Sequence, residues 1–104
     1  MNTIGTNSSA NTLNGANNSV GSQGGNNILG GDGNSLGDMN FHNTISGFQN
    51  SIANDAQSNL VHGNGNNLGT STFGNTVTGF NNDLSVGSIS GAVVMGDGLS
   101  LIHI

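Results

Sequence analysis

The chain has no cysteine, proline, lysine, arginine, tryptophan or tyrosine among its 104 residues. Without cysteine there is no disulfide framework. Without basic residues, and with a formal charge of −5, the chain lacks the positive surface that holds phosphate groups. No apolar run approaches the roughly 18 residues that a membrane span needs. We therefore expect no nucleic-acid partner and no membrane insertion.

Apolar residues are also scarce, at 32 % of the chain. This fraction is low for a chain of this length that folds around an ordinary packed core. Richness in Gly, Asn and Ser is often typical of disorder, because too little apolar area is buried to offset the conformational entropy. Disordered segments carry no strict register, however, and this chain has one.

The register is a repeat of sixteen residues, which is the main feature of the sequence. Every sixteenth residue from position 2 is Asn, and every sixteenth residue from position 4 is aliphatic. The Asn row consists of Asn2, Asn18, Asn34, Asn50, Asn66 and Asn82. The aliphatic row consists of Ile4, Val20, Leu36, Ile52, Leu68 and Leu84.

A second aliphatic row is predicted between these positions, with spacings that alternate between 15 and 17 residues. Its members are Leu13, Ile28, Ile45, Leu60 and Val77. Asn or Ser stands two residues before each of them, at Asn11, Asn26, Asn43, Ser58 and Asn75, and glycine follows at Gly15, Gly30, Gly47 and Gly79. Alternation with a period of two places the Asn and the aliphatic residue on one side of a strand.

These rows predict an all-β fold, a single β-solenoid of about six 16-residue coils over residues 1–98. Each coil has two short strands, and its Asn and aliphatic side chains point inward and form ladders. Helices are disfavoured, because the aliphatic residues recur near every eighth position. Phe41 with Phe73, and Phe48 with Phe80, recur in every second coil and are predicted to be stacked turn residues with a packing role.

The pattern changes at the C-terminus, where no Asn follows Asn82. Gly96, Asp97 and Gly98 match Gly31, Asp32 and Gly33 at an offset of 65, which predicts a register slip of one residue. Residues 99–104 are interpreted either as a cap for the open edge or as a non-native tail, since they are similar to the translation of a transposon-derived adapter. On the second interpretation, the chain is part of a longer repeat protein.

Residues that support catalysis or metal binding are few. His42, His62 and His103 are far apart in the repeat, and the five acidic residues are scattered Asp. The stretch from Gly30 to Asn34 looks like the start of a calcium-binding nonapeptide repeat, but Ser35 occupies the position where a carboxylate is needed. We therefore expect no catalytic residue, no metal ligand and no cofactor, and a protein that is not an enzyme.

The outward face of the second strand is the predicted binding surface. It is predicted to carry hydroxyl and amide groups from Thr12, Asn14, Asn27, Thr44, Ser46, Asn59, Thr76 and Thr78, with Leu29 and Val61 in the same outward rows. Such a flat array, with about 4.8 Å between coils, suits ordering of water in an ice-like lattice. It equally suits packing against another copy, or a solvated face with no ligand.

The pattern Asn-x-aliphatic-x-Gly, at residues 11–15, 26–30, 43–47 and 75–79, resembles the Asn-rich repeats of plant ice recrystallisation inhibition proteins. Residues 19–21 and 90–96 more loosely resemble the head repeats of trimeric bacterial adhesins. The first resemblance implies a β-roll with Asn ladders and ice binding, and the second implies a surface adhesin.

Two functions are expected from these patterns. The first is an extracellular or cell-surface structural or adhesive rod, which self-associates as a trimer or end to end or which binds a host or matrix surface. The alternative is an ice-binding module that uses the outward Thr and Asn residues. The first 30 residues lack the basic start and apolar stretch of a secretory signal, so the extracellular expectation requires a signal outside this chain.

Overall fold

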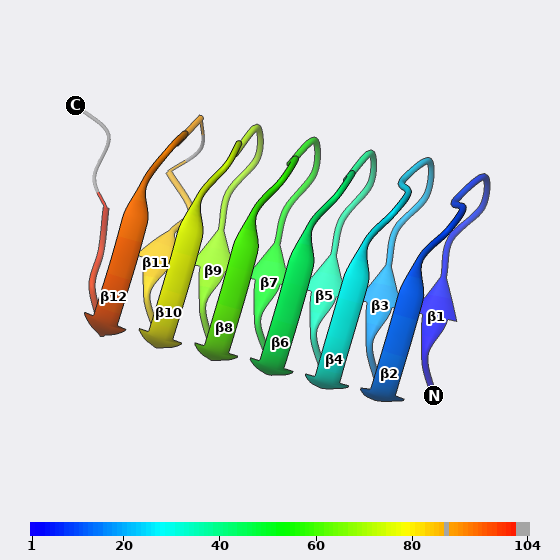
Figure 1. Cartoon of the computed structure of the whole chain (residues 1–104), viewed down its shortest axis with the longest axis horizontal. Coiled ribbons are helices and arrows are strands. Elements are labelled where there is room, and N and C mark those ends of the chain that lie inside the picture. Colours follow the sequence, from blue (N-terminus) through cyan, green and yellow to red (C-terminus); the bar gives the residue numbers. More distant parts are fainter. Residues whose placement is uncertain (87, 102–104) are drawn as a thin grey trace.

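A computed structural model describes residues 1–86 and 88–101, and in these residues the chain is a β-solenoid with no helix. Two parallel sheets of six strands run along the solenoid, one made of short strands and one of longer strands. Figure 1 shows the long strands side by side in front, with the short strands behind them. The all-β solenoid of about six 16-residue coils, predicted from the repeat, is confirmed.

Each coil contributes one strand to each sheet. The short strands are β1 (Thr3–Ile4), β3 (Ser19–Val20), β5 (Ser35–Leu36), β7 (Ser51–Ile52), β9 (Asn67–Leu68) and β11 (Asp83–Leu84). The long strands are β2 (Thr12–Ala16), β4 (Ile28–Asp32), β6 (Thr44–Phe48), β8 (Leu60–Asn64), β10 (Thr76–Phe80) and β12 (Val93–Asp97). We number the coils 1 to 6, so that coil 1 contains β1 and β2 and coil 6 contains β11 and β12.

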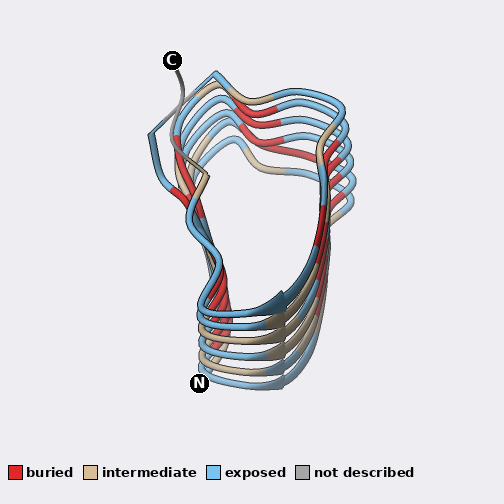
Figure 2. Ribbon diagram, turned by 90° about the vertical axis from the view of Figure 1, so that its left-hand side faces the viewer, coloured by how far each residue is buried: buried red, intermediate tan, exposed pale blue. Residues whose placement is uncertain are grey.

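A third side of the coil was not predicted. Single bridges connect one residue of each coil to the next, in the order Ser9, Gly25, Phe41, Gln57, Phe73 and Ser90. The chain turns at left-handed positions, for example at Asn17, Gln23 and Asn26, whose φ angles are 55°, 60° and 58°. Viewed nearly end on, the coils stack on one another, and the buried stretches of the ribbon recur at the same places in successive coils (Figure 2). The molecule measures 35 × 22 × 14 Å.

The predicted second aliphatic row is wrong in the even-numbered coils. Ile28 and Leu60 point outward and are 52 % and 45 % exposed, whereas Leu29 and Val61 are fully buried. Leu13 pairs with Leu29, and Leu29 with Ile45, so the step between neighbouring coils is sixteen residues. An alternation of 15 and 17 would require a bulge in every coil, and it would interrupt the sheet hydrogen bonds.

Two buried ladders of Asn side chains join the coils. In the first, the Oδ1 atoms of Asn18, Asn34, Asn50 and Asn66 each accept hydrogen bonds from the backbone N–H and the Nδ2 of the Asn sixteen residues later, as between Asn34 and Asn50 at 3.1 Å. The second ladder contains Asn11, Asn27, Asn43, Asn59 and Asn75, and repeats these contacts. Asn26 and Ser58, predicted for this row, are exposed corner residues. The inward Asn ladders are therefore confirmed, with different members in the second.

A row of glycines lies between the ladders, at Gly15, Gly31, Gly47, Gly63, Gly79 and Gly96. A Cβ atom at Gly31 would lie 1.9 Å from the carbonyl oxygen of Gly47, and the φ angle of Gly31 is +106°. The backbones of neighbouring coils thus approach closely along this row, and Gly30, one of the glycines that follow the predicted aliphatic row, does not belong to it. Nothing lies within 4 Å of a Cβ atom built at Gly30.

The apolar core is a thin column of two strand side chains in each of coils 2 to 6, with Ala56 as a third buried side chain in coil 4. Val20, Leu36, Ile52, Leu68 and Leu84 line it from the short strands, as predicted, and Leu29, Ile45, Val61, Val77 and Val94 line it from the long strands. Ile4, predicted for the same ladder, is 50 % exposed. It lies in coil 1, where no preceding coil covers it.

The phenylalanines are not stacked turn residues. Phe48 and Phe80 end the long strands β6 and β10, with Asn64 of β8 between them in the pairing order. Phe41 and Phe73 lie on the bridge side, with Gln57 between them. All four are exposed. Stacking fails because recurrence in every second coil leaves one coil between the rings.

Coil 6 contains the predicted register slip. Thr76 pairs with Val93 and Phe73 with Ser90, a step of seventeen residues. Both Asn ladders end there, because Ala92 and Leu99 stand at the Asn positions. Their backbone N–H groups donate to Asn75 Oδ1 and Asn82 Oδ1, but their side chains have no amide that could continue the ladders. Residues 99–101 continue the coil, since Ser100 bridges Asp83 and Leu101 packs partly against the core. His103 lies outside the described residues.

Candidate functional site

The outer face of the long-strand sheet is the largest regular surface of the solenoid. We call it the long-sheet face and define it by two rows of outward residues. The first row contains Thr12, Ile28, Thr44, Leu60, Thr76 and Val93. The second row contains Asn14, Gly30, Ser46, His62, Thr78 and Met95. The alternation of side chains along a strand turns both rows away from the core.

The structure brings six of the eight predicted surface residues together on this face. They are Thr12, Asn14, Thr44, Ser46, Thr76 and Thr78. The other two predictions, Asn27 and Asn59, are wrong, because both side chains are buried in the second Asn ladder. Leu29 and Val61, expected in the outward rows, are core residues. Their places on the face are taken by Ile28 and Leu60 in one row and by Gly30 and His62 in the other.

Side chains on the long-sheet face alternate in kind between odd and even coils. In the first row, Thr stands in coils 1, 3 and 5, and an aliphatic residue stands in coils 2, 4 and 6. Equivalent groups therefore repeat at every second coil, about 9.6 Å apart. Of the large apolar side chains here, Val93 and Met95 are 72 % and 70 % exposed. Four of the twelve residues of the face are thus large and apolar.

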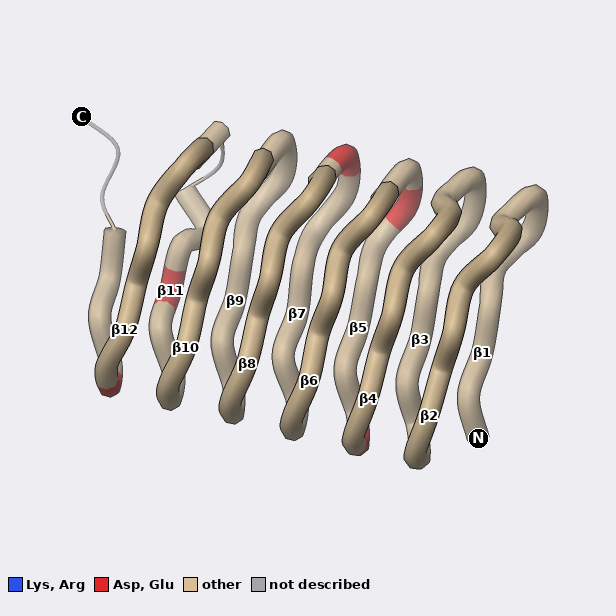
Figure 3. The backbone as a smooth tube through the Cα atoms, viewed as in Figure 1, with Lys and Arg blue, Asp and Glu red and all other residues tan. Residues whose placement is uncertain are grey.

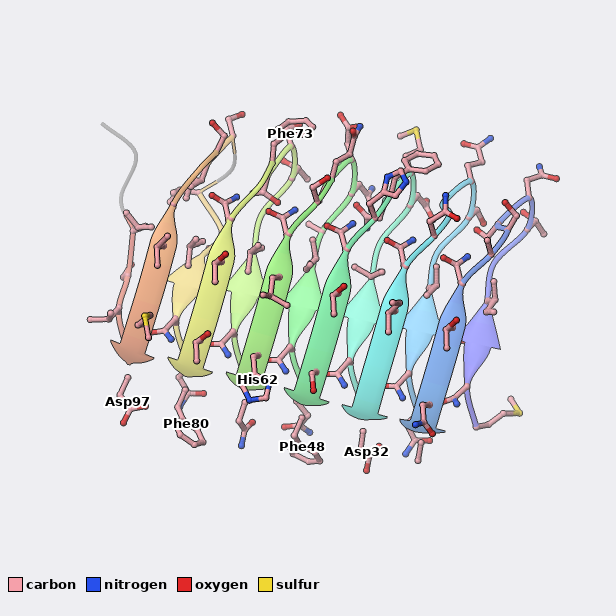
Figure 4. The ribbon with its side chains drawn as sticks, in the orientation of Figure 1. Asp32, Phe48, His62, Phe73, Phe80 and Asp97 are labelled. Carbon is pink, nitrogen blue, oxygen red and sulfur yellow. The ribbon has the colours of Figure 1, made fainter. Side chains whose placement is uncertain are left out.

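The last residue of each long strand adds an edge to this face, with the opposite alternation. Phe48 and Phe80 stand there in coils 3 and 5, and Asp32, Asn64 and Asp97 in coils 2, 4 and 6. Figure 4 shows the labelled Asp and Phe side chains projecting from this edge, and His62 on β8 beside it. Coils 3 and 5 thus carry Thr at one end of the strand and Phe at the other, and coil 1 carries Thr12 and Ala16.

The short-strand sheet presents a second face made of small polar side chains. Its outward row contains Thr3, Ser19, Ser35, Ser51, Asn67 and Asp83. Hydrogen bonds from the Ser85 hydroxyl and backbone N–H lower the pKa of Asp83 below its usual value. This face is narrower than the long-sheet face, because its strands contribute two residues each.

Charge is confined to the edges and the second face. Asp38 and Asp55 lie in the turns that follow the short strands, Asp32 and Asp97 end long strands, and Asp83 lies on β11 (Figure 3). The two rows of the long-sheet face contain no carboxylate. Within residues 1–86 and 88–101, no group of three or more His, Asp or Glu side chains is placed to hold a metal ion.

A groove opens at the C-terminal end of the solenoid, between Val94, Met95, Leu99 and Leu101. It is the uncovered end of the apolar column, and no titratable side chain lines it. At the opposite end, the buried Nδ2 of Asn11 has no hydrogen-bond partner within the described residues. Both features arise from the ends of the ladders, and neither has the convergent polar groups of a ligand pocket.

Comparison with protein-family models finds no match, and comparison with curated proteins finds none either. In the part of the chain that the structure describes, no helix is long and apolar enough to cross a membrane.

Proposed function

We propose that this chain is a rigid, non-enzymatic rod segment of an extracellular or cell-surface protein, which spaces or presents adhesive surfaces. The observation that carries this proposal is the unbroken hydrogen bonding between coils. In the central coils, each junction contains two sheets, one bridge and two Asn ladders. A solenoid joined in this way bends little, because every junction resists bending by the same set of bonds.

The spacing role predicts a single end-to-end distance. Ser9 and Ser90 occupy the same row in coils 1 and 6, and both are exposed. Five steps of about 4.8 Å separate them by roughly 24 Å. We expect spin labels on the double variant Ser9→Cys/Ser90→Cys, diluted with unlabelled protein, to give one narrow distance distribution near that value plus the label arms. The chain has no native cysteine, so labelling is confined to these positions.

A broad distribution in the folded protein, similar to that of the same sample in urea, would contradict the rod. The adhesive part is tested separately with beads coated with the protein, under flow over matrix-coated glass. We expect more beads to be retained than with a coating of the unfolded chain. Equal retention would leave a spacer without adhesion.

Ice binding is a second candidate, favoured by the row of Thr12, Thr44 and Thr76 on a flat sheet. Hydroxyl and methyl groups repeat there about every 9.6 Å. We expect the triple variant Thr12→Tyr/Thr44→Tyr/Thr76→Tyr to lose ice recrystallisation inhibition if the parent has it, because the bulky rings destroy the flat array. The matched control is Thr3→Tyr/Ser35→Tyr/Ser51→Tyr on the short-strand face, which should retain it. A folded parent without activity ends this candidate.

A further inference from the structure

We propose that two copies of this chain pair through the long-sheet face, sheet against sheet, with the order of coils reversed. This pairing gives the proposed rod a partner, a second copy of the same chain, and it rests on the proposed rigidity of the rod. The first observation is electrostatic. The chain carries a charge of −5 without one basic residue, so close approach of two copies is unfavourable wherever carboxylates meet. The two rows of the long-sheet face carry none, which makes this face suitable for contact.

The second observation is the alternation of side-chain size. A two-fold axis in the plane of the face, parallel to the strands, brings coil 1 against coil 6, coil 2 against coil 5 and coil 3 against coil 4. Odd coils then always meet even coils. The resulting pairs are Thr12 with Val93, Ile28 with Thr76 and Thr44 with Leu60 in the first row, and Asn14 with Met95, Gly30 with Thr78 and Ser46 with His62 in the second.

Five of the six pairs join a larger side chain to a smaller one, as the interlocking of two packed sheets requires, and Thr12 with Val93 joins two side chains of similar size. At the strand ends, which form the edge of the contact, Asp32 then faces Phe80 and Asp97 faces Ala16. No two carboxylates are opposed. The complementarity depends on the alternation of Thr and aliphatic residues in the first row, which has a period of two coils.

The other two-fold arrangement, with the axis along the solenoid, fits less well. It places each coil against itself, so Met95 meets Met95 and Gly30 meets Gly30. The first pair is crowded, and the second leaves a gap. The sizes of the side chains therefore select the reversed order of coils.

The area of the face indicates how strongly the copies bind. Six strands about 4.8 Å apart and five residues long give a footprint of roughly 29 × 16 Å. Allowing for the side chains that stand above it, the contact lies near the lower limit of specific interfaces, about 1,200 Å² in total. We expect a dimer that forms in the micromolar range and dissociates on dilution.

Sedimentation equilibrium of the full chain tests the pairing, with Leu60→Asp as the disruptive variant. Leu60 is 45 % exposed, so the change leaves the core intact. We expect at least a tenfold weaker dimer, because two carboxylates enter the contact. The matched control is Ser51→Asp on the short-strand face, in the row where Asp83 already stands. It adds the same charge and should dimerise like the parent. A parent that remains monomeric at several hundred micromolar overturns the proposal.

The order of coils is tested with one spin label on Asn14→Cys. In the reversed dimer, the two labels lie five coils apart along the axis and about 10 Å across the contact, a separation of roughly 26 Å. In the unreversed dimer they face each other at about 10 Å, which broadens the continuous-wave spectrum. Such broadening would overturn the reversed order. The Ser9 and Ser90 distance is measured within one chain, so the rod and the dimer can fail independently.

Discussion

Replacement of Gly31 by alanine is expected to destabilise the solenoid by about 4 kcal/mol, or to prevent folding. The added Cβ atom would lie 1.9 Å from the carbonyl oxygen of Gly47, where the neighbouring group is backbone and has no rotamer to change. The φ angle of +106° adds strain that an L-residue rarely tolerates. Overpacking costs about 1–3 kcal/mol and backbone strain a similar amount.

The neighbouring residue provides the control. Gly30 lies in the same strand, nothing lies within 4 Å of a Cβ atom placed on it, and its φ is outside the left-handed region. Gly30→Ala is therefore expected to be neutral, or to stabilise by up to about 1 kcal/mol through the unfolded chain. Urea unfolding followed by circular dichroism measures both variants. Equal destabilisation by the two changes would show that the glycine row is not a backbone contact.

The glycine row also supports the first Asn ladder through its backbone carbonyl groups. The carbonyl oxygen of Gly31 accepts a hydrogen bond from Asn18 Nδ2 at 2.9 Å, and that of Gly47 accepts one from Asn34 Nδ2 at 3.0 Å. A side chain between these carbonyl groups would separate the coils and lengthen the Asn contacts together. The backbone approach and the first Asn ladder are thus one structural unit, repeated in each coil.

The first Asn row was predictable from sequence because its step is constant and its aliphatic partner is unambiguous. Asn34, Ser35 and Leu36 illustrate this, since only one aliphatic residue follows at the right distance. The coil, the two strands and the inward ladder all follow from that regularity. The one-residue slip in coil 6 was predictable as well, because Gly96, Asp97 and Gly98 repeat Gly31, Asp32 and Gly33.

The second row was mispredicted where two Asn residues are followed by two aliphatic ones. In the stretch Asn26, Asn27, Ile28 and Leu29, both Asn-x-aliphatic pairs fit the local pattern. The glycine two residues after Ile28 favoured the wrong pair. A slip of one residue moves a side chain to the opposite face of a strand, so the error exchanged core and surface. The constant step of sixteen from Asn11 to Asn27 was the signal that decides the register.

The outward residues were less predictable, because no ladder constrains them. Inward positions must repeat so that Asn meets Asn and the apolar column stays filled. Within one chain, the side chains at outward positions such as His62 and Met95 do not belong to a ladder. The repeat that determines the fold therefore does not restrict which residue type stands there. Their size alternation became visible only after the register was fixed, and it is this alternation that supports the pairing of two copies.

Replacement of Asn66 by alanine is expected to cost at least about 4 kcal/mol. Asn66 is fully buried, and its Nδ2 donates to Asn50 Oδ1 at 3.0 Å and to the Gly79 carbonyl oxygen at 2.9 Å. Its Oδ1 accepts from the backbone N–H and the Nδ2 of Asn82 at 3.1 and 3.0 Å. Alanine removes these four hydrogen bonds and a longer one to the His62 carbonyl oxygen at 3.5 Å. It leaves buried partners without replacements, each at about 1–3 kcal/mol.

The adjacent Asn67 is the matched control, because it is the same residue type on the outward side of β9 and is exposed. Asn67→Ala should change the free energy of unfolding by less than about 0.5 kcal/mol. Equal losses from the two alanine variants in urea unfolding would mean that the ladder does not hold the coils together.

The variant Asn66→Asp tests the acceptor role of the Asn66 amide oxygen separately from the donor role of its nitrogen. The carboxylate keeps the acceptor that Asn82 requires but cannot donate to Asn50 or Gly79. Burial raises the folded-state pKa of such a carboxyl above its unfolded value. The variant should therefore be strongly destabilised at neutral pH and should recover relative to the parent as pH falls, because the protonated group can donate one hydrogen bond again. The absence of any recovery in acid would show that the acceptor and the packing alone sustain the ladder.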